Sequence, residues 1–155
     1  RSEKEVQQQA PERSRSESGL LVVLDLFGKL WTLPYTLIGF LIGLPAIGLG
    51  ARISFGENAV RFEDFPFGCG ALTLGNCVIY ARGTAPADKV IGMYDDPRCL
   101  CVGRHEQAHT YQYQLLGPLF LPVYFLAGGI SPRNPLERAA NEYAAGGSWW
   151  PRGWR

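Results

Sequence analysis

Charged side chains are scarce in this sequence. They make up 19% of its 155 residues, against roughly 25% in an ordinary globular protein. The 15 Lys and Arg are balanced by 14 Asp and Glu, which leaves a formal net charge of +1. Sequence-independent binding to nucleic acid requires many basic contacts to phosphate. The composition therefore argues against a nucleic-acid partner.

Histidine and cysteine are also few, with two and four residues. The cysteines are Cys69, Cys77, Cys99 and Cys101. Their spacing fits no common zinc-finger or C-x-x-C redox pattern. We interpret them as small, half-buried apolar residues.

The shortage of charge is concentrated in two runs. Residues 30–51 carry no charged side chain, and as a helix they are long enough to cross the roughly 30 Å core of a bilayer. The apolar run at residues 115–130 is interrupted by Pro118 and Pro122. It is too short to span and fits a re-entrant, interfacial or buried segment. Hydropathy alone does not separate membrane contact from an unusually apolar core, so both alternatives stay open here.

Composition divides the chain into four segments. Residues 1–19 are almost all polar, and we predict a disordered tail there because such a segment buries too little apolar area to offset its ordering entropy. Residues 20–51 are predicted to be an apolar helical segment, with membrane contact as one alternative. Residues 52–148 form one domain. Residues 149–155 are a tail rich in Trp and Arg, which fits either a membrane interface or packing on the domain.

The domain begins with apolar residues at a period of two, which predicts β-strands. The turn Gly56-Glu57-Asn58 separates the first two alternating runs. Gly75-Asn76 suits a type II′ turn between two more. We predict three or four short antiparallel strands between Arg52 and Ala81.

Two helices are predicted after the strands. The first runs from Leu100 to Leu116 and ends at Gly117-Pro118. The second has Asn134 as its N-cap and Pro135 at the first helical position, and it runs to about Ala145.

The first helix carries His105-Glu106-Gln107-Ala108-His109, an H-E-x-x-H motif. Residues four apart share one face of a helix, so both imidazoles can bind a single Zn²⁺. Glu106 points toward the open coordination position, where it can take a proton from zinc-bound water as general base. The motif predicts a zinc cofactor and hydrolysis by activated water.

A catalytic zinc site needs a third protein ligand. The chain has no further His, which excludes the pattern H-E-x-x-H-x-x-G-x-x-H. A carboxylate is therefore expected, and the second helix offers Glu137 and Glu142. We predict Glu137 as the ligand and keep Glu142 as the alternative. Glu137 also lies three residues after Asn134, where a Glu commonly closes a capping box.

The residues from Glu137 to Ala144 resemble the E-x-x-A-N/D-x-F/Y-A signature on the third-ligand helix of gluzincin-type peptidases, including the ImmA/IrrE group. In this match Glu137 falls on the ligand Glu. The residues from His105 to Leu119 resemble small bacterial zincin-like proteins in which an H-E-x-x-H-T-x-Q helix runs into an L-G-P-L segment. The second resemblance covers most of residues 20–150.

These resemblances imply an α+β, zincin-like fold. Its parts are the apolar N-terminal helical segment, a small antiparallel sheet, the H-E-x-x-H helix and a second ligand helix, so that residues 52–148 are the metal-binding domain. The implied activity is a zinc-dependent metallopeptidase acting on a peptide or protein substrate. Arg104, Tyr113 and Tyr143 are candidates for contacts to the substrate or to an oxyanion.

Two other functions remain open at the level of sequence. One is a catalytically inactive zinc-binding structural or membrane protein, in which Cys99 or Cys101 would close the site as a fourth ligand. The other is a bacterial effector or toxin built on the same fold.

Overall fold

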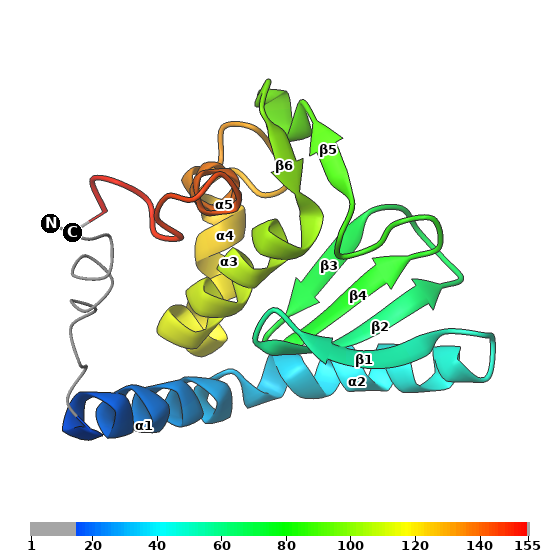
Figure 1. The fold of residues 1–155 in the computed structure, drawn as a ribbon, viewed down its shortest axis with the longest axis horizontal. Coiled ribbons are helices and arrows are strands. Elements are labelled where there is room, and N and C mark those ends of the chain that lie inside the picture. The colour runs from blue at the N-terminus through cyan, green and yellow to red at the C-terminus, as the bar shows by residue number, and fades with distance from the viewer. Residues whose placement is uncertain (1–14, 155) are drawn as a thin grey trace, which may run out of the picture.

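The computed structural model describes residues 15–154 and has an α+β fold (Figure 1). Two helices, α1 (Arg15–Trp31) and α2 (Leu33–Ile47), lie along one side of the molecule. A four-stranded sheet packs on α2, and a cluster of helices packs beside it on α1. The sheet consists of β1 (Arg52–Gly56), β2 (Ala59–Phe65), β3 (Ala71–Leu74) and β4 (Cys77–Ala81). The helix cluster consists of α3 (Val102–Leu116), the 3-10 turn η2 (Gly117–Leu119), α4 (Phe120–Leu126) and α5 (Pro135–Ala144).

The sheet is mixed, which corrects the prediction of an antiparallel one. Its strand order is β1-β2-β4-β3. The β1–β2 and β3–β4 pairs are antiparallel hairpins, but β2 and β4 run parallel. All five residues of β4 are buried, so this uncharged strand takes the inner position and leaves β3 at the edge. Period-two patterning identifies strands but does not determine their order.

Both predicted hairpin turns are present. Glu57 and Asn58 have positive φ, as a two-residue type I′ turn requires, and Ile53 pairs with Phe62 as the alternation implies. Gly75 has φ +64° at the β3–β4 turn, which agrees with the first central position of a type II′ turn.

A further hairpin, β5 (Lys89–Ile91) with β6 (Cys99–Cys101), precedes α3. The predicted start of the helix at Leu100 is therefore wrong by two residues, because Leu100 pairs with Val90 in this hairpin. Between β5 and β6 lies the 3-10 turn η1 (Met93–Asp95), where Tyr94 has φ +50°.

The apolar segment at residues 30–51 is not one straight helix. It is broken at Thr32, where Pro34 at the start of α2 cannot donate a helical hydrogen bond. Among the described helices none alone is long and apolar enough to cross a membrane, whereas the stretches Gly19–Trp31 and Leu33–Ile47 meet that criterion as a pair bent by 64°.

The prediction of a disordered tail at residues 1–19 is wrong for its last five residues. Residues 1–14 lie outside the described part of the chain, and residues 15–19 belong to α1. Of the C-terminal tail, residues 149–154 are described. Trp150 packs against the core around Tyr113 and Leu136, which matches the alternative of packing on the domain.

Helix α5 begins, and helix α3 ends, where the sequence favours it. Asn134 caps α5 by accepting a hydrogen bond from the Leu136 amide, and Pro135 is at the first helical position, as predicted. Helix α3 ends at Gly117, which has φ +54°. A Cβ there would lie 1.9 Å from the indole nitrogen of Trp31, so the position requires glycine. Helices α3 and α5 pack together over their length.

Candidate metal centre

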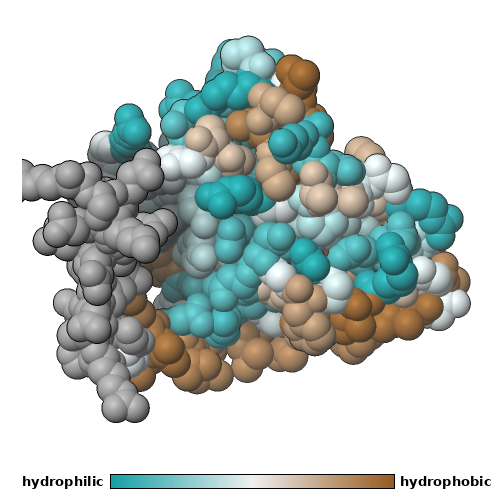
Figure 2. All heavy atoms as spheres, viewed as in Figure 1, coloured by the Kyte–Doolittle hydropathy of each residue, from teal (hydrophilic) through white to brown (hydrophobic). Residues whose placement is uncertain are grey.

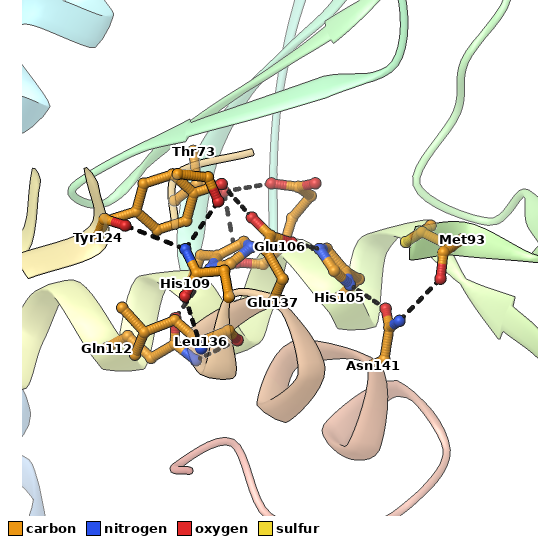
Figure 3. Close-up of polar contacts among 12 residues, drawn as sticks. Thr73, Met93, His105, Glu106, His109, Gln112, Tyr124, Leu136, Glu137 and Asn141 are labelled. Atoms are coloured by element: carbon orange, nitrogen blue, oxygen red, sulfur yellow. Dashed lines mark hydrogen bonds and ion pairs between the residues drawn. The ribbon is translucent and has the colours of Figure 1, made fainter. Parts of the chain in front are cut away.

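Three side chains from two helices converge at the centre of the domain (Figure 3). His105 and His109 lie one turn apart on the buried face of α3, and Glu137 comes from the first turn of α5. Their ligand atoms are close: Nε2 of His105 is 3.2 Å from Nε2 of His109 and 3.1 Å from Oε2 of Glu137. Nε2 of His109 is 3.5 Å from the same carboxylate oxygen. All three residues are buried, so together they could bind a metal ion.

The outward nitrogens of both imidazoles donate to amide oxygens. Nδ1 of His105 is 2.9 Å from Oδ1 of Asn141, whose own amide nitrogen donates to the Met93 carbonyl. Nδ1 of His109 is 2.9 Å from Oε1 of Gln112, whose nitrogen donates to the carbonyls of Leu136 and Trp149. An amide oxygen only accepts hydrogen bonds, so Nδ1 carries a proton in each ring.

This arrangement leaves the Nε2 lone pairs for a cation. A neutral imidazole protonated at Nδ1 has an acceptor at Nε2. Two such acceptors and a carboxylate oxygen would repel one another at 3.1–3.5 Å unless a proton or a metal ion lies between them. Around a tetrahedral ion with bonds of about 2.0–2.1 Å, ligand atoms lie roughly 3.3 Å apart. The spacing in the structure fits that geometry.

When no metal is present, a proton on His109 relieves the repulsion between the two imidazoles and the carboxylate. Burial by itself lowers the pKa of His109, but the carboxylates of Glu137 and Glu106 more than offset burial and raise the pKa to about 9. Burial likewise raises the pKa of Glu137, yet His109 and His105 outweigh burial and hold that pKa far below its usual range. Without a metal the site thus holds an ionised pair, and a metal ion that binds there replaces the proton on His109.

Glu137 does not act as the helix cap. Asn134 fills that role, while the Glu137 carboxylate contacts the two imidazoles through Oε2 and accepts a hydrogen bond from the Tyr124 hydroxyl through Oε1. Tyr124 lies on α4, within the second apolar run. The second apolar run therefore supplies the hydroxyl that orients the Glu137 carboxylate.

Glu106 lies beside the three ligands but is not among them. Its Oε2 accepts a hydrogen bond of 2.6 Å from the Thr73 hydroxyl on β3, and the residue is only 7% exposed. The edge strand of the sheet thereby orients the carboxylate that the motif places next to the metal position.

A cavity of about 130 Å³ opens in front of these groups. Glu106, the three ligands and Thr73 line it together with Tyr94, Tyr113 and Tyr124. The ring of Tyr94 stacks on His105 with centroids 5.9 Å apart. Tyr113 is fully buried, and its hydroxyl has no hydrogen-bond partner among the described residues. The remaining lining is apolar: Ala71, Leu72, Phe120, Leu121, Phe125 and Ile130.

Three residues predicted for the site lie away from this cavity: two candidate substrate contacts and the alternative metal ligand. The Tyr143 hydroxyl donates to Gln107, and the Arg104 guanidinium lies 4.7 Å from the centre of the Tyr143 ring. Neither residue lines the cavity, so a substrate contact by either residue would lie outside it. Glu142 forms an ion pair with Arg98 and is absent from the ligand group. Helical spacing alone did not show which face of α5 meets α3.

The cysteines do not join the ligand group within the described residues. The Cys101 thiol donates to the Pro86 carbonyl, and Cys99 is exposed. The fourth ligand that a closed structural site would need is therefore not supplied by either residue in this structure.

Four residues of the site were not assigned a role from the sequence. Asn141 and Gln112 belong to the motifs that carry the family resemblance. Their helical spacing from Glu137 and His109 could have predicted that they lie near the imidazoles. Thr73 and Tyr124 come from distant segments, and no local pattern indicated that they would meet Glu106 and Glu137.

Replacing Gln112 or Asn141 with Ala is expected to weaken metal binding by about 10–100-fold, because the outer partner fixes the tautomer and the orientation of each ligating ring. Metal affinity can be measured by competition with a chelator. Gln107→Ala is the matched control, since this residue lies on the same helix and contacts Tyr111 and Tyr143 instead. An affinity of Gln112→Ala and Asn141→Ala equal to that of the control would contradict the assigned role.

Comparison of the chain with protein-family models, with curated proteins and with solved structures finds no match.

Proposed function

We propose that this protein is a zinc-dependent peptidase. The observation that carries the proposal is the position of Glu106: a buried carboxylate outside the ligand group, oriented by Thr73, in the cavity that the three ligands share. A purely structural metal site has no need of such a group, whereas hydrolysis by activated water requires a base at this place.

The donor set favours zinc over calcium and magnesium. Two imidazoles and one carboxylate form the ligand set of catalytic zinc sites, which leave a fourth position open. Calcium and magnesium prefer all-oxygen sites. When bound, zinc supplies Lewis-acid polarisation of a carbonyl and activation of water.

The chain's own residues then perform the proton transfers. Glu106 takes a proton from the attacking water as the new C–O bond forms at the scissile carbonyl. It delivers that proton to the amide nitrogen as the C–N bond breaks. The Thr73 hydrogen bond holds the carboxylate in place through both steps. The Tyr113 hydroxyl has no protein partner and lines the cavity, so it is our candidate donor to the oxyanion.

The edge strand gives the substrate a place to bind. In the described sheet β3 pairs only with β4, and Ala71, Leu72 and Thr73 line the cavity. An extended peptide can add alongside such an edge through main-chain hydrogen bonds. That pairing would bring a peptide carbonyl next to Glu106 and the ligands.

The proposal is tested by incubating the zinc-loaded chain with a mixture of random-sequence peptides and identifying the cleavage products by mass spectrometry. We expect cleavage that stops when a chelator removes the metal and returns when zinc is restored. The structural alternative predicts zinc uptake without any cleavage.

Zinc affinity is expected to rise about tenfold from pH 7 to pH 8. His109, with a pKa raised to about 9 in the metal-free site, must lose its proton before it can bind zinc. Each binding event below pH 9 therefore releases that proton, so affinity increases with pH. Chelator competition at the two pH values measures the effect, and an affinity that falls or stays constant would contradict the assigned protonation.

A further inference from the structure

The outer face of α1 and α2 is an apolar surface that the rest of the described chain leaves open. Figure 2 shows hydrophobic residues gathered along the edge of the molecule formed by these helices, below a mostly polar face. More than half of the side-chain surface is exposed at Leu20, Val22, Phe27, Leu30, Leu37 and Leu41. Monomeric soluble proteins rarely expose apolar patches of this extent.

The two helices bury their small and polar residues and expose their large apolar ones. The buried positions are Gly28, Thr32, Thr36, Gly39, Gly43 and Ala46. They recur every three or four residues and so form one stripe. A helix on a water-soluble protein has the opposite pattern, with its apolar stripe toward the core. Small residues at the protein interface and apolar ones outside are typical of helices in lipid.

Close packing explains why the inner stripe is small. A Cβ added at Gly39 would lie 2.6 Å from the Cys77 side chain, and one added at Gly43 would lie 2.3 Å from the Phe62 ring. The helix backbone therefore lies directly against the sheet. Tyr35 and Phe40 pack partly against the core, and the large aliphatic side chains of α2 point outward.

Asp25 and Lys29 are the charged residues of α1 beyond Leu20, and 37% of each side chain is exposed. Asp25 pairs with Lys29 at 2.6 Å and accepts hydrogen bonds from Asn58 and Gln114. No other charged residue lies between Leu20 and Ala51. In lipid, ionisable side chains are tolerated where they pair with one another and face the protein.

The break between the helices also has its polar groups satisfied from within. The side-chain nitrogen of Asn76 donates to the Lys29 carbonyl and to the Thr32 hydroxyl. The backbone N–H of Asn76 donates to the Thr36 hydroxyl. Helix breaks in lipid persist only where side chains satisfy the freed backbone groups. The break is thus compatible with a lipid environment on its outer side.

The apolar surface continues to the mouth of the metal-site cavity along two routes. Ile42 of α2 lines a second cavity with Phe67 and Leu72, and Leu72 also lines the metal-site cavity. The second route runs from α2 to α4. Tyr35 of α2 donates a hydrogen bond to the Pro118 carbonyl, and α4 begins two residues later. Leu126 at the end of α4 is 90% exposed.

The geometry points to one lipid-contact surface, made of the outer faces of α1 and α2 and the apolar rim of the cavity, that inserts into the acyl region of a phospholipid bilayer. Between Leu20 and Ala51 the charged residues are Asp25 and Lys29, which pair with each other. Neutral phospholipid is therefore expected to be sufficient, and salt is not expected to release the protein. A peptide substrate would then approach the cavity from the membrane. That consequence rests on the proposed function, whereas lipid contact does not.

The test uses the full chain and vesicles of phosphatidylcholine. We expect the protein to float with the vesicles in 1 M NaCl (roughly a 3 Å screening length). Leu41→Asp is expected to lower the partition coefficient at least about tenfold, because a Leu that would lie among the acyl chains is replaced by a charge. Ile91→Asp is the matched control: Leu41 and Ile91 are 74% and 73% exposed, but Ile91 lies on β5, far from α1 and α2 (Figure 1). Its partition should stay within about twofold of the parent chain.

The fluorescence of Trp31 provides a second measurement of lipid contact, and this measurement does not depend on a destabilising variant. It is 44% exposed at the end of α1. Lipids brominated in their acyl chains should quench its fluorescence, and Trp31→Phe should lose that component of the quenching. Glu106→Gln should bind vesicles as the parent chain does, which separates lipid contact from hydrolysis.

Three results would overturn the proposal. The first is a chain that stays at the bottom of the gradient, and the second is flotation without quenching at Trp31. The third is a dimer in lipid-free solution that Leu41→Asp converts to monomers, since a second copy would then be the partner of this surface.

Discussion

Glu106→Gln is expected to retain one zinc ion per chain and to lower kcat for peptide hydrolysis by about 10²–10⁴-fold, the range that a general base contributes. Glutamine has nearly the same shape and can still accept the hydrogen bond from Thr73, but its amide cannot take a proton from water. The ligand group does not include residue 106, so the metal should remain.

The measurement combines zinc analysis with the rate of peptide cleavage on the same preparation. Gln107→Ala, one residue further along α3, is the control and should keep both zinc and activity. Unchanged cleavage by Glu106→Gln would mean that another group is the base. Loss of zinc would mean that the carboxylate is needed to hold the metal.

Glu137→Gln is expected to have the largest effect on the site itself. The exchange removes one ligand atom and the charge that holds His109 protonated. We expect zinc affinity to fall by at least about 1,000-fold, beyond the 10–100-fold that loss of an outer partner causes. The metal-free variant should also lose about 3–5 kcal/mol of unfolding free energy, because breaking a buried ion pair leaves the other partner unpaired.

Glu142→Gln is the matched control for this prediction. It changes the same atoms five residues along the same helix, at a half-exposed carboxylate that pairs with Arg98. Surface pairs of this kind contribute little, so both zinc affinity and stability should be unchanged. Zinc retained by Glu137→Gln and lost by Glu142→Gln would show that the ligand had been wrongly assigned.

Local sequence signals predicted the start of α5 and the end of α3 because the causes of both are local. Asn134 and Pro135 determine where α5 begins through one side-chain hydrogen bond and one fixed dihedral angle. The distance of four residues between His105 and His109 places both rings on one face for the same reason. The β1–β2 register likewise follows from alternation and a two-residue turn.

The order of the strands and the rest of the site depend on contacts between distant segments. The parallel pairing of β2 with β4 brings β3 to the edge of the sheet, and only there can Thr73 contact Glu106. Tyr124 meets Glu137 because η2 turns the chain back over α3 after Gly117. No pattern within either segment encodes these contacts.

The apolar run at residues 30–51 was ambiguous for a different reason. Hydropathy shows how apolar a helix is but not the direction in which each side chain points. The structure resolves it into a broken helix whose small residues face the protein and whose large apolar residues face outward. The charge deficit therefore lies on the surface next to the metal-site cavity as well as in the core.

X-ray absorption at the zinc edge tests the central claim, an open site of two His and one Glu, most directly. For the zinc-loaded chain we predict two imidazole nitrogens and light oxygen ligands at about 2.0–2.1 Å, with no sulfur. A shell of sulfur at about 2.3 Å would show that Cys99 or Cys101 closes the site, and it would contradict the assignment of a catalytic centre.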